Sequence, residues 1–93
     1  MNRIVVRLIV RGRVQGVGFR WWARETARRL GVDGWVRNLA DGSVELLAAG
    51  PDAVVAEFVD SCRAGPSGAR VSSVERHAAT DDAGSGFEAR PSS

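Results

Sequence analysis

Hydrophobic residues in this chain first alternate and then recur with a helical spacing, and the chain makes this change twice. Over residues 3–12, apolar residues occupy one side of an extended chain: Ile4, Val6, Leu8 and Val10. The other side mixes arginine with β-branched residues. This pattern predicts a strand with one buried face and one face in contact with solvent.

From Phe19 to Leu30 the apolar spacing becomes three and four, which predicts an amphipathic helix. Its apolar positions are Phe19, Trp22, Ala23, Ala27 and Leu30. Gly31 follows as a stop signal, and Glu25 is spaced to pair with Arg29 one turn later.

The second half of the chain repeats the strand and helix signals. Residues 32–38 and 43–49 predict two strands, and the Asp41-Gly42 turn predicts that they pair antiparallel. We expect a second helix to open at Gly50-Pro51-Asp52, with proline at its first position, and to end within residues 64–68. Its apolar side is formed by Val54, Val55, Phe58, Val59 and Cys62.

The C-terminal region gives weaker signals. Residues 69–77 predict a fourth strand, with a bulge because Val71 and Val74 break the alternation. We expect a loop over residues 80–86, a short last strand over 87–90 and a frayed tail over 91–93.

This order of elements predicts an α+β fold of the ferredoxin-like type, the split βαβ arrangement. Right-handed crossovers place both helices on one face of an antiparallel sheet, with a possible short fifth strand. Since domains usually span about 50 to 250 residues, we expect residues 1–93 to form a single domain. Many unrelated functions use this architecture, so the fold by itself identifies none of them.

Cysteine and histidine are too scarce for a disulfide framework or a structural zinc site. The chain has only Cys62 and His77, which can neither close an intrachain disulfide nor supply four zinc ligands. The apolar residues near the N-terminus are interrupted by Arg3, Arg7 and Arg11, which fits neither a signal peptide nor a membrane span. We therefore expect a cytoplasmic protein with no membrane partner.

Charge is divided unevenly along the chain. Residues 1–40 carry nine arginines and two acidic residues, a net charge of +7, whereas residues 41–93 carry four arginines and nine acidic residues, a net charge of −5. A basic first half is typical of proteins that bind nucleic acid or a phosphorylated metabolite, and it could equally pair with the acidic half of the same chain.

A glycine-rich loop joins the first predicted strand to the first predicted helix. Its sequence from Gly12 to Arg20 is GRVQGVGFR. Glycines allow main-chain N–H groups to converge, the first helical amides have no helical partner, and the planar guanidinium of Arg20 matches the oxygens of a phosphate. The nucleotide-binding P-loop requires a lysine, which the chain lacks, and the dinucleotide motif fails at Trp21. The loop therefore predicts a site for a single phosphoryl group.

Two long motifs around this loop resemble the acylphosphatase family. The first is V-x-G-R-V-Q-G-V-G-F-R at residues 10–20, and the second is A-x-x-L-G-V-x-G-W-V-R-N at residues 27–38, followed by D-G-x-V-E at residues 41–45. The resemblance covers nearly the whole chain. It implies an enzyme that hydrolyses the carboxyl-phosphate bond of acyl phosphates without a metal ion, another cofactor or a phosphoenzyme.

The resemblance also implies roles for individual residues. Arg20 and the main-chain amides of the loop would bind the phosphate, and Asn38 would orient the attacking water. The loop residues concerned are Gln15, Gly16, Val17, Gly18, Phe19 and Arg20. A neutral carboxamide suits the role of Asn38, because it has both an acceptor and donors and does not repel an anion. Trp21 and Trp22 depart from the pattern as bulky residues beside the expected pocket.

Two alternatives remain at this stage. A ferredoxin-like RNA-binding module would share the order of elements, but it stacks bases on aromatic residues of its central strands, and residues 3–12 and 43–49 have none. A domain that binds a phosphorylated metabolite without turnover would not need Asn38 to orient a water, so the presence of Asn38 makes this alternative less favoured. We therefore expect a free-standing monomer that takes an acyl phosphate, releases inorganic phosphate and binds no nucleic acid.

Overall fold

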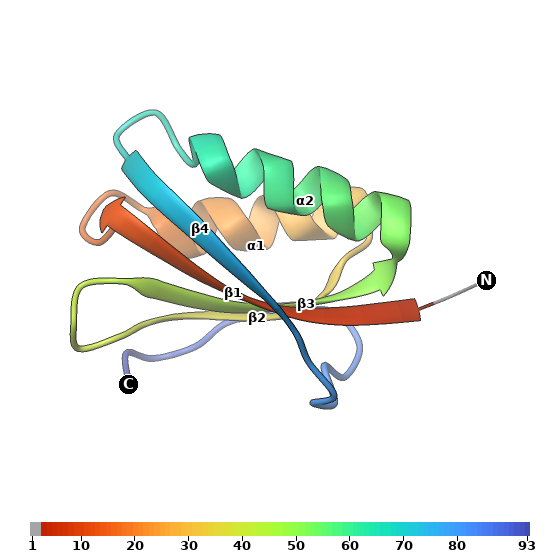
Figure 1. The fold of residues 1–93 in the computed structure, drawn as a ribbon. Helices are drawn as coiled ribbons and strands as arrows, with labels where there is room; N and C mark the ends of the chain where they lie inside the picture. Colours follow the sequence, from red (N-terminus) through yellow and green to blue (C-terminus); the bar gives the residue numbers. More distant parts are fainter. Residues whose placement is uncertain (1–2) are drawn as a thin grey trace.

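The computed structural model describes residues 3–93, and these form five strands and two helices. Their order is β1 (Arg3–Arg13), α1 (Phe19–Leu30), β2 (Asp33–Asn38), β3 (Val44–Pro51), α2 (Asp52–Ala64), β4 (Arg70–Ala78) and β5 (Phe87–Ala89). Both helices cover one face of a single sheet (Figure 1). The ferredoxin-like α+β prediction is confirmed.

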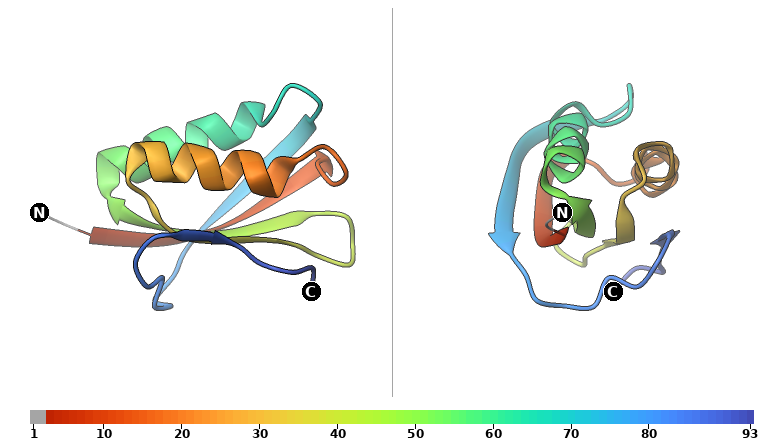
Figure 2. Two further views of the ribbon diagram at one scale, coloured as in Figure 1. Left: turned by 180° about the vertical axis from the view of Figure 1, so that it is seen from behind. Right: turned by 90° about the vertical axis from the view of Figure 1, so that its right-hand side faces the viewer.

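The strands lie in the order β4-β1-β3-β2-β5. Neighbouring strands among the first four run antiparallel, as predicted, whereas β5 runs parallel to β2. The prediction of a wholly antiparallel sheet is therefore wrong at this edge. The reason is the path of residues 79–86, which cross from β4 to the opposite edge of the sheet on the side away from the helices (Figure 2).

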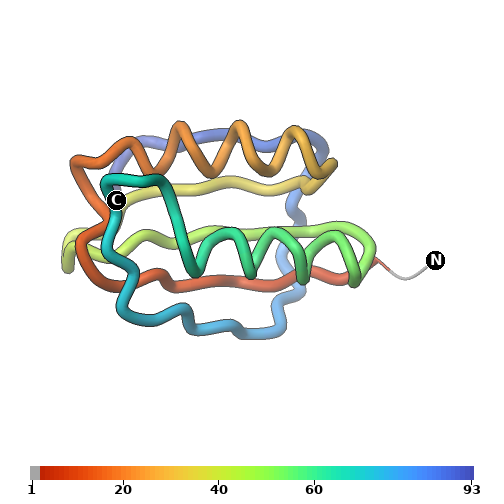
Figure 3. The backbone as a smooth tube through the Cα atoms, turned by 90° about the horizontal axis from the view of Figure 1, so that it is seen from above, coloured from red at the N-terminus to blue at the C-terminus, as the bar shows by residue number. Residues whose placement is uncertain are grey.

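The core lies between the sheet and the two helices. Seen from above, α1 lies over β2 and β5, and α2 lies over β1 and β3 (Figure 3). Of the four residues predicted on the buried face of β1, Val6, Leu8 and Val10 are buried. Ile4 is partly buried and packs against the core. Phe58 of α2 packs edge-to-face on Phe87 of β5 with ring centroids 5.6 Å apart, which anchors the fifth strand to the core.

Three local predictions are corrected. Pro51 is the N-cap of α2 and the last residue of β3, one position before the first helical residue. Glu25 contacts Arg24, with Nε and Oε2 3.5 Å apart, rather than Arg29. The tail is exposed, but the Ser93 amide donates to the Asn38 carbonyl at 2.9 Å, so it extends the edge of β2 instead of fraying.

The predicted bulge is present where β1 meets β4, since their register shifts between Arg11 and Gly12. The extra residue is Ser72 of β4, which lies between the partners of Arg11 and Gly12, opposite the last residues of β1. Bulges often redirect a strand next to a functional site. Among residues 3–93, neither helix has the length and apolar run that crossing a bilayer requires.

Candidate active site

The glycine-rich loop spans residues 14–18 between β1 and α1. Val14 anchors it in the core with 1% of its surface exposed. Gly18 has a φ of 77° and forms the N-cap of α1, a left-handed conformation that residues with a side chain rarely adopt. The conformation at Gly18 turns the chain from the loop into the helix.

The main-chain amides of this loop are not used by the fold. Within residues 3–93, the amides from Gln15 to Trp21 donate to no main-chain oxygen. The first helical hydrogen bond runs from the Trp22 amide to the Gly18 carbonyl at 3.0 Å. No side chain caps α1, and no acidic residue occupies its first turn. The positive end of this helix is thus available to an anion.

Arg20 lies in the first turn of α1, beside these amides. Its Nη1 donates to the main-chain carbonyl of Arg90 at 3.0 Å, immediately after β5. The Arg90 amide in turn donates to the Val36 carbonyl of β2 at 2.8 Å. The C-terminal segment therefore holds the guanidinium of Arg20 while leaving its remaining N–H groups for a ligand.

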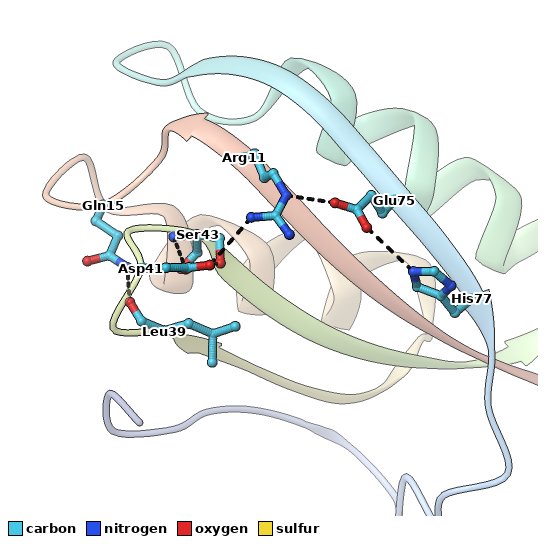
Figure 4. A network of polar contacts seen from close by, with 7 residues as sticks. All are labelled: Arg11, Gln15, Leu39, Asp41, Ser43, Glu75 and His77. Atoms are coloured by element: carbon cyan, nitrogen blue, oxygen red, sulfur yellow. Dashed lines mark hydrogen bonds and ion pairs between the residues drawn. The ribbon is translucent and has the colours of Figure 1, made fainter.

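Asn38 is the last residue of β2, and Gln15 links this strand end to the loop. The Gln15 side-chain amide donates to the carbonyls of Leu39 at 2.8 Å and Ser43 at 2.9 Å, on the two sides of the β2–β3 turn (Figure 4). The contact with Ser93 fixes the Asn38 main chain on its other edge.

A cavity of about 350 Å³ lies where these elements meet. It is lined by Val14, Gly16, Gly18, Phe19, Arg20, Trp21, Arg24, Asn38 and Ala89. Arg20 and Asn38 therefore face one cavity, and within residues 3–93 its ionisable lining residues are two arginines. Such a site can bind an anion and place water beside it, but none of the described lining side chains is a carboxylate, imidazole or thiol that could act as base or nucleophile.

The predicted site residues are distributed as follows. Gly16, Gly18, Phe19, Arg20 and Asn38 line the cavity, whereas Gln15 and Val17 do not. The Phe19 side chain is buried against Trp22, with ring centroids 5.3 Å apart, so that only the Phe19 main chain is available to a ligand. The Gln15 side chain turns to the hairpin instead.

Arg24 also lines the cavity, although it was not among the predicted site residues. The signal was available, because Arg24 follows Arg20 by four residues, and such residues share one side of a helix. Trp21 was placed beside the pocket by its sequence position, and it lines the cavity with 62% of its surface exposed.

Three of the N-terminal arginines pair with the acidic half of the chain: Arg7 and Arg37 contact Glu45, and Arg11 contacts Glu75 and Asp41. Arg3 contacts Asp33, which belongs to the basic half. None of these described residues lines the cavity. Much of the charge asymmetry seen in the sequence is thus neutralised within the protein, which leaves less of it to explain by an external partner.

The Arg11 pairs form part of a surface network (Figure 4). Arg11 Nε donates to Glu75 Oε2 at 2.6 Å and holds the pKa of that carboxyl below its usual value. The hydroxyl and amide of Ser43 lower the pKa of Asp41, and Arg11 adds to the effect. His77 Nε2 lies 3.6 Å from Glu75 Oε1.

Cys62 is fully buried in α2, as its helical spacing predicted. Burial raises the pKa of its thiol to about 12. A thiol in this environment stays protonated at neutral pH and acts as a small hydrophobic residue rather than as a nucleophile.

Comparison with known proteins supplies a family for this geometry. A family model described as Acylphosphatase matches residues 6–89. An acylphosphatase of Nitrobacter hamburgensis is 59% identical over 75 residues, which cover 81% of this chain and 76% of that protein. An acylphosphatase of Rhizobium etli is 57% identical over 74 residues, covering 80% of this chain and 79% of that protein.

Solved structures agree with the sequence relatives. The structure of an acylphosphatase from Coxiella burnetii superposes with a TM-score of 0.91 at 36% identity, covering 96% of this chain and 94% of that one. The acylphosphatase from Bacillus subtilis gives a TM-score of 0.88 at 35% identity, covering 94% of this chain and 98% of that one.

Proposed function

The chain belongs to the acylphosphatase family and hydrolyses acyl phosphates, and from that premise we propose how its residues divide the work. Arg20 and the amides of residues 15–20 hold the phosphoryl group, and Asn38 orients the water that attacks phosphorus. The carboxylate then leaves and inorganic phosphate remains, with no metal ion and no covalent enzyme intermediate. The observation that carries this proposal is that Arg20 and Asn38 line one cavity at the N-terminus of α1.

Phosphate binding is supported by the unused donors of the loop. Amides that make no main-chain hydrogen bond within residues 3–93 point to a ligand with several acceptor oxygens, and a phosphoryl group has three. Arg20 adds a fixed positive charge that the carbonyl of Arg90 holds in position. In comparable sites one donor aimed at developing negative charge contributes about 3 kcal/mol to transition-state stabilisation.

The role of Asn38 follows from its place at the end of β2. It lines the cavity together with Arg20 and the glycines of the loop, so a water bonded to its side chain would lie beside a phosphoryl group bound there. Its carboxamide oxygen can accept a hydrogen bond from that water while its NH₂ donates a hydrogen bond to a phosphoryl oxygen. An aspartate at this position would repel the dianion instead.

The leaving group explains why the site needs no general acid. A carboxylate leaves with its negative charge, so its departure requires no proton. Catalysis then depends on positioning and electrostatic stabilisation, which the lining residues can supply without an acid or base. A phosphoryl oxygen of the substrate accepts the proton of the attacking water.

The direct test is release of inorganic phosphate from acetyl phosphate by the full chain, with and without EDTA, beside a phosphate monoester. The proposal expects release from acetyl phosphate only, at the same rate with the chelator. Release that EDTA abolishes would overturn the metal-free mechanism. Binding of either compound without any release would favour the alternative of a non-catalytic phosphometabolite-binding module.

We also propose that residues 1–93 form a single domain that acts as a monomer in the cytoplasm and needs no nucleic acid. Support comes from the one sheet and shared core of residues 3–93, from the free thiol of Cys62 and from the internal pairing of the basic strand residues. Sedimentation velocity at assay concentrations and titration with single-stranded RNA at about 0.1 M salt test these points.

A further inference from the structure

A second arginine lines the cavity beyond the phosphoryl site. Arg24 follows Arg20 by one helical turn on α1, and residues with this spacing have Cβ atoms about 6 Å apart on one side of a helix. If the amides at the start of α1 hold the phosphoryl group, Arg24 lies beside the part of the cavity that remains for the acyl group.

The guanidinium of Arg24 is poorly satisfied by the protein. Its Nε is buried and, within residues 3–93, makes no hydrogen bond. Its nearest acidic oxygen is Glu25 Oε2 at 3.5 Å, on a side chain that is 48% exposed. Arg37 makes a much closer contact, with its Nε 2.7 Å from Glu45. Because this Nε is enclosed by the protein, an anionic ligand would bind the terminal N–H groups of the Arg24 guanidinium, whose side chain is 34% exposed.

The cavity is also large enough for a short carbon chain and has an apolar side on which such a chain could pack. Its volume of about 350 Å³ falls in the range of about 300 to 1,000 Å³ typical of small-molecule sites. Trp21 lines it with a largely exposed indole, and Ala89 of β5 contributes a small apolar surface. The cavity thus joins a phosphoryl site to an apolar wall and a second cation.

We infer that Arg24 selects acyl phosphates whose acyl group carries a second carboxylate, two or three carbons from the scissile bond. The inference rests on the proposed function, because it requires the phosphoryl group to lie at Arg20. Arg24 would bind the distal carboxylate with its planar guanidinium while Trp21 covers the intervening methylenes. Arg24 is then a specificity-determining residue and takes no part in the bond cleavage.

The experiment compares two substrates of equal chain length, succinyl phosphate and butyryl phosphate, which differ in the distal carboxylate. The full-length wild-type protein is expected to show a kcat/KM for succinyl phosphate about tenfold above that for butyryl phosphate, the effect of one charge-assisted hydrogen bond in a partly exposed site. In Arg24→Gln this ratio should fall to about one, chiefly through a loss of kcat/KM for succinyl phosphate.

Two further variants separate direct contact from general charge effects. Arg28→Gln removes an exposed arginine one turn further along α1 that does not line the cavity, and its substrate ratio should remain that of the wild type. Glu25→Gln removes the acidic neighbour that competes for Arg24, so its ratio should rise above the wild-type value. Arg24→Lys should keep part of the preference, because it retains the charge without the planar fork.

The outcomes distinguish this inference from the proposed function. A wild-type ratio near one, or a ratio that Arg24→Gln leaves unchanged, would overturn the role of Arg24 while butyryl phosphate hydrolysis persists. Equal losses in Arg24→Gln and Arg28→Gln would also overturn it, since they would indicate long-range attraction. Failure of the wild-type protein to hydrolyse either compound would contradict the proposed function itself.

Discussion

The side-chain amide of Gln15 donates a hydrogen bond to the main-chain carbonyl of Leu39, with nitrogen and oxygen 2.8 Å apart. Leu39 follows Asn38 directly, and Gln15 lies in the glycine-rich loop whose amides are proposed to bind the phosphate. One side chain therefore joins the two halves of the site, which come from elements on either side of α1 in the sequence. The same side-chain nitrogen also donates to the main-chain carbonyl of Ser43, so two hydrogen bonds make this link.

Replacement of Gln15 by leucine should lower kcat strongly and the free energy of unfolding only moderately. The change removes both hydrogen bonds and lets the loop move relative to Asn38, so kcat should fall about tenfold, since small misplacements of reacting groups are costly. The free energy of unfolding should fall by about 1 to 2 kcal/mol, because two partly buried carbonyls lose a donor. Steady-state kinetics and urea denaturation measure the two effects. A variant with wild-type kcat would show that the link does not position the site.

The rate of hydrolysis should depend little on pH near neutrality. Among residues 3–93, the cavity lining includes no carboxylate, imidazole or thiol. We expect kcat for acetyl phosphate to change by less than about twofold between about pH 6 and pH 8. A pH series of initial rates at saturating substrate, corrected for spontaneous hydrolysis, provides the measurement. A bell-shaped profile centred in this range would indicate a titrating acid or base that the account lacks.

Gly34 should tolerate no side chain. It has a φ of 138°, and a Cβ at this position would lie 1.8 Å from the Leu47 carbonyl oxygen on the neighbouring strand. Gly34→Ala should destabilise the protein by about 3 kcal/mol or more, because strand pairing must open to admit the methyl group. Gly84→Ala is the matched control, since Gly84 also has a positive φ but open surroundings, and it should lose only about 1 kcal/mol. Thermal unfolding followed by circular dichroism tests the contrast, and equal effects in the two variants would refute it.

Asp33 should contribute stability that disappears in acid. Its carboxylate accepts hydrogen bonds from Arg3 and from the Gly86 amide, both at 2.8 Å, and chiefly the Arg3 bond lowers its pKa. Because the folded pKa lies below the unfolded value of about 3.9, this stabilisation is present above about pH 4 and is lost as pH falls through the folded pKa. The free energy of unfolding of Asp33→Asn should therefore be about 1 kcal/mol below that of the wild type at neutral pH, and equal to it at pH values below the folded pKa of Asp33. Urea denaturation at a series of pH values checks this, and a pH-independent difference would contradict it.

Much of the fold could be predicted from periodicity because most elements bury one face. The bounds of α1 agree with the spacing of apolar residues between Phe19 and Leu30, and the bulge followed from the broken alternation at Val71 and Val74. The parallel pairing of β5 could not be predicted, since it depends on where residues 79–86 cross the sheet. No local pattern in three strand residues encodes that path.

Less of the site could be predicted without the family resemblance. The loop and Arg20 stand out because glycines and an arginine before a helix make an anion site, but Asn38 is only an asparagine near a turn until the fold brings it to the same cavity. Arg24 could have been assigned to the site, because its spacing places it on the same side of α1 as Arg20. The contact of Ser93 with Asn38 could not be predicted, because it joins segments far apart in the sequence and Ser93 looks like a free end.

The central claim is that loop amides and Arg20 bind the phosphoryl group while Asn38 acts on the attacking water. The most direct measurement is kcat for acetyl phosphate, together with the inhibition constant of inorganic phosphate, in Asn38→Ala and Arg20→Ala. We predict that Asn38→Ala lowers kcat by about 10² to 10³-fold and leaves the inhibition constant of phosphate unchanged within about threefold. Arg20→Ala should lower kcat and also raise the inhibition constant of phosphate. Wild-type turnover in folded Asn38→Ala, or unimpaired phosphate inhibition in folded Arg20→Ala, would contradict it.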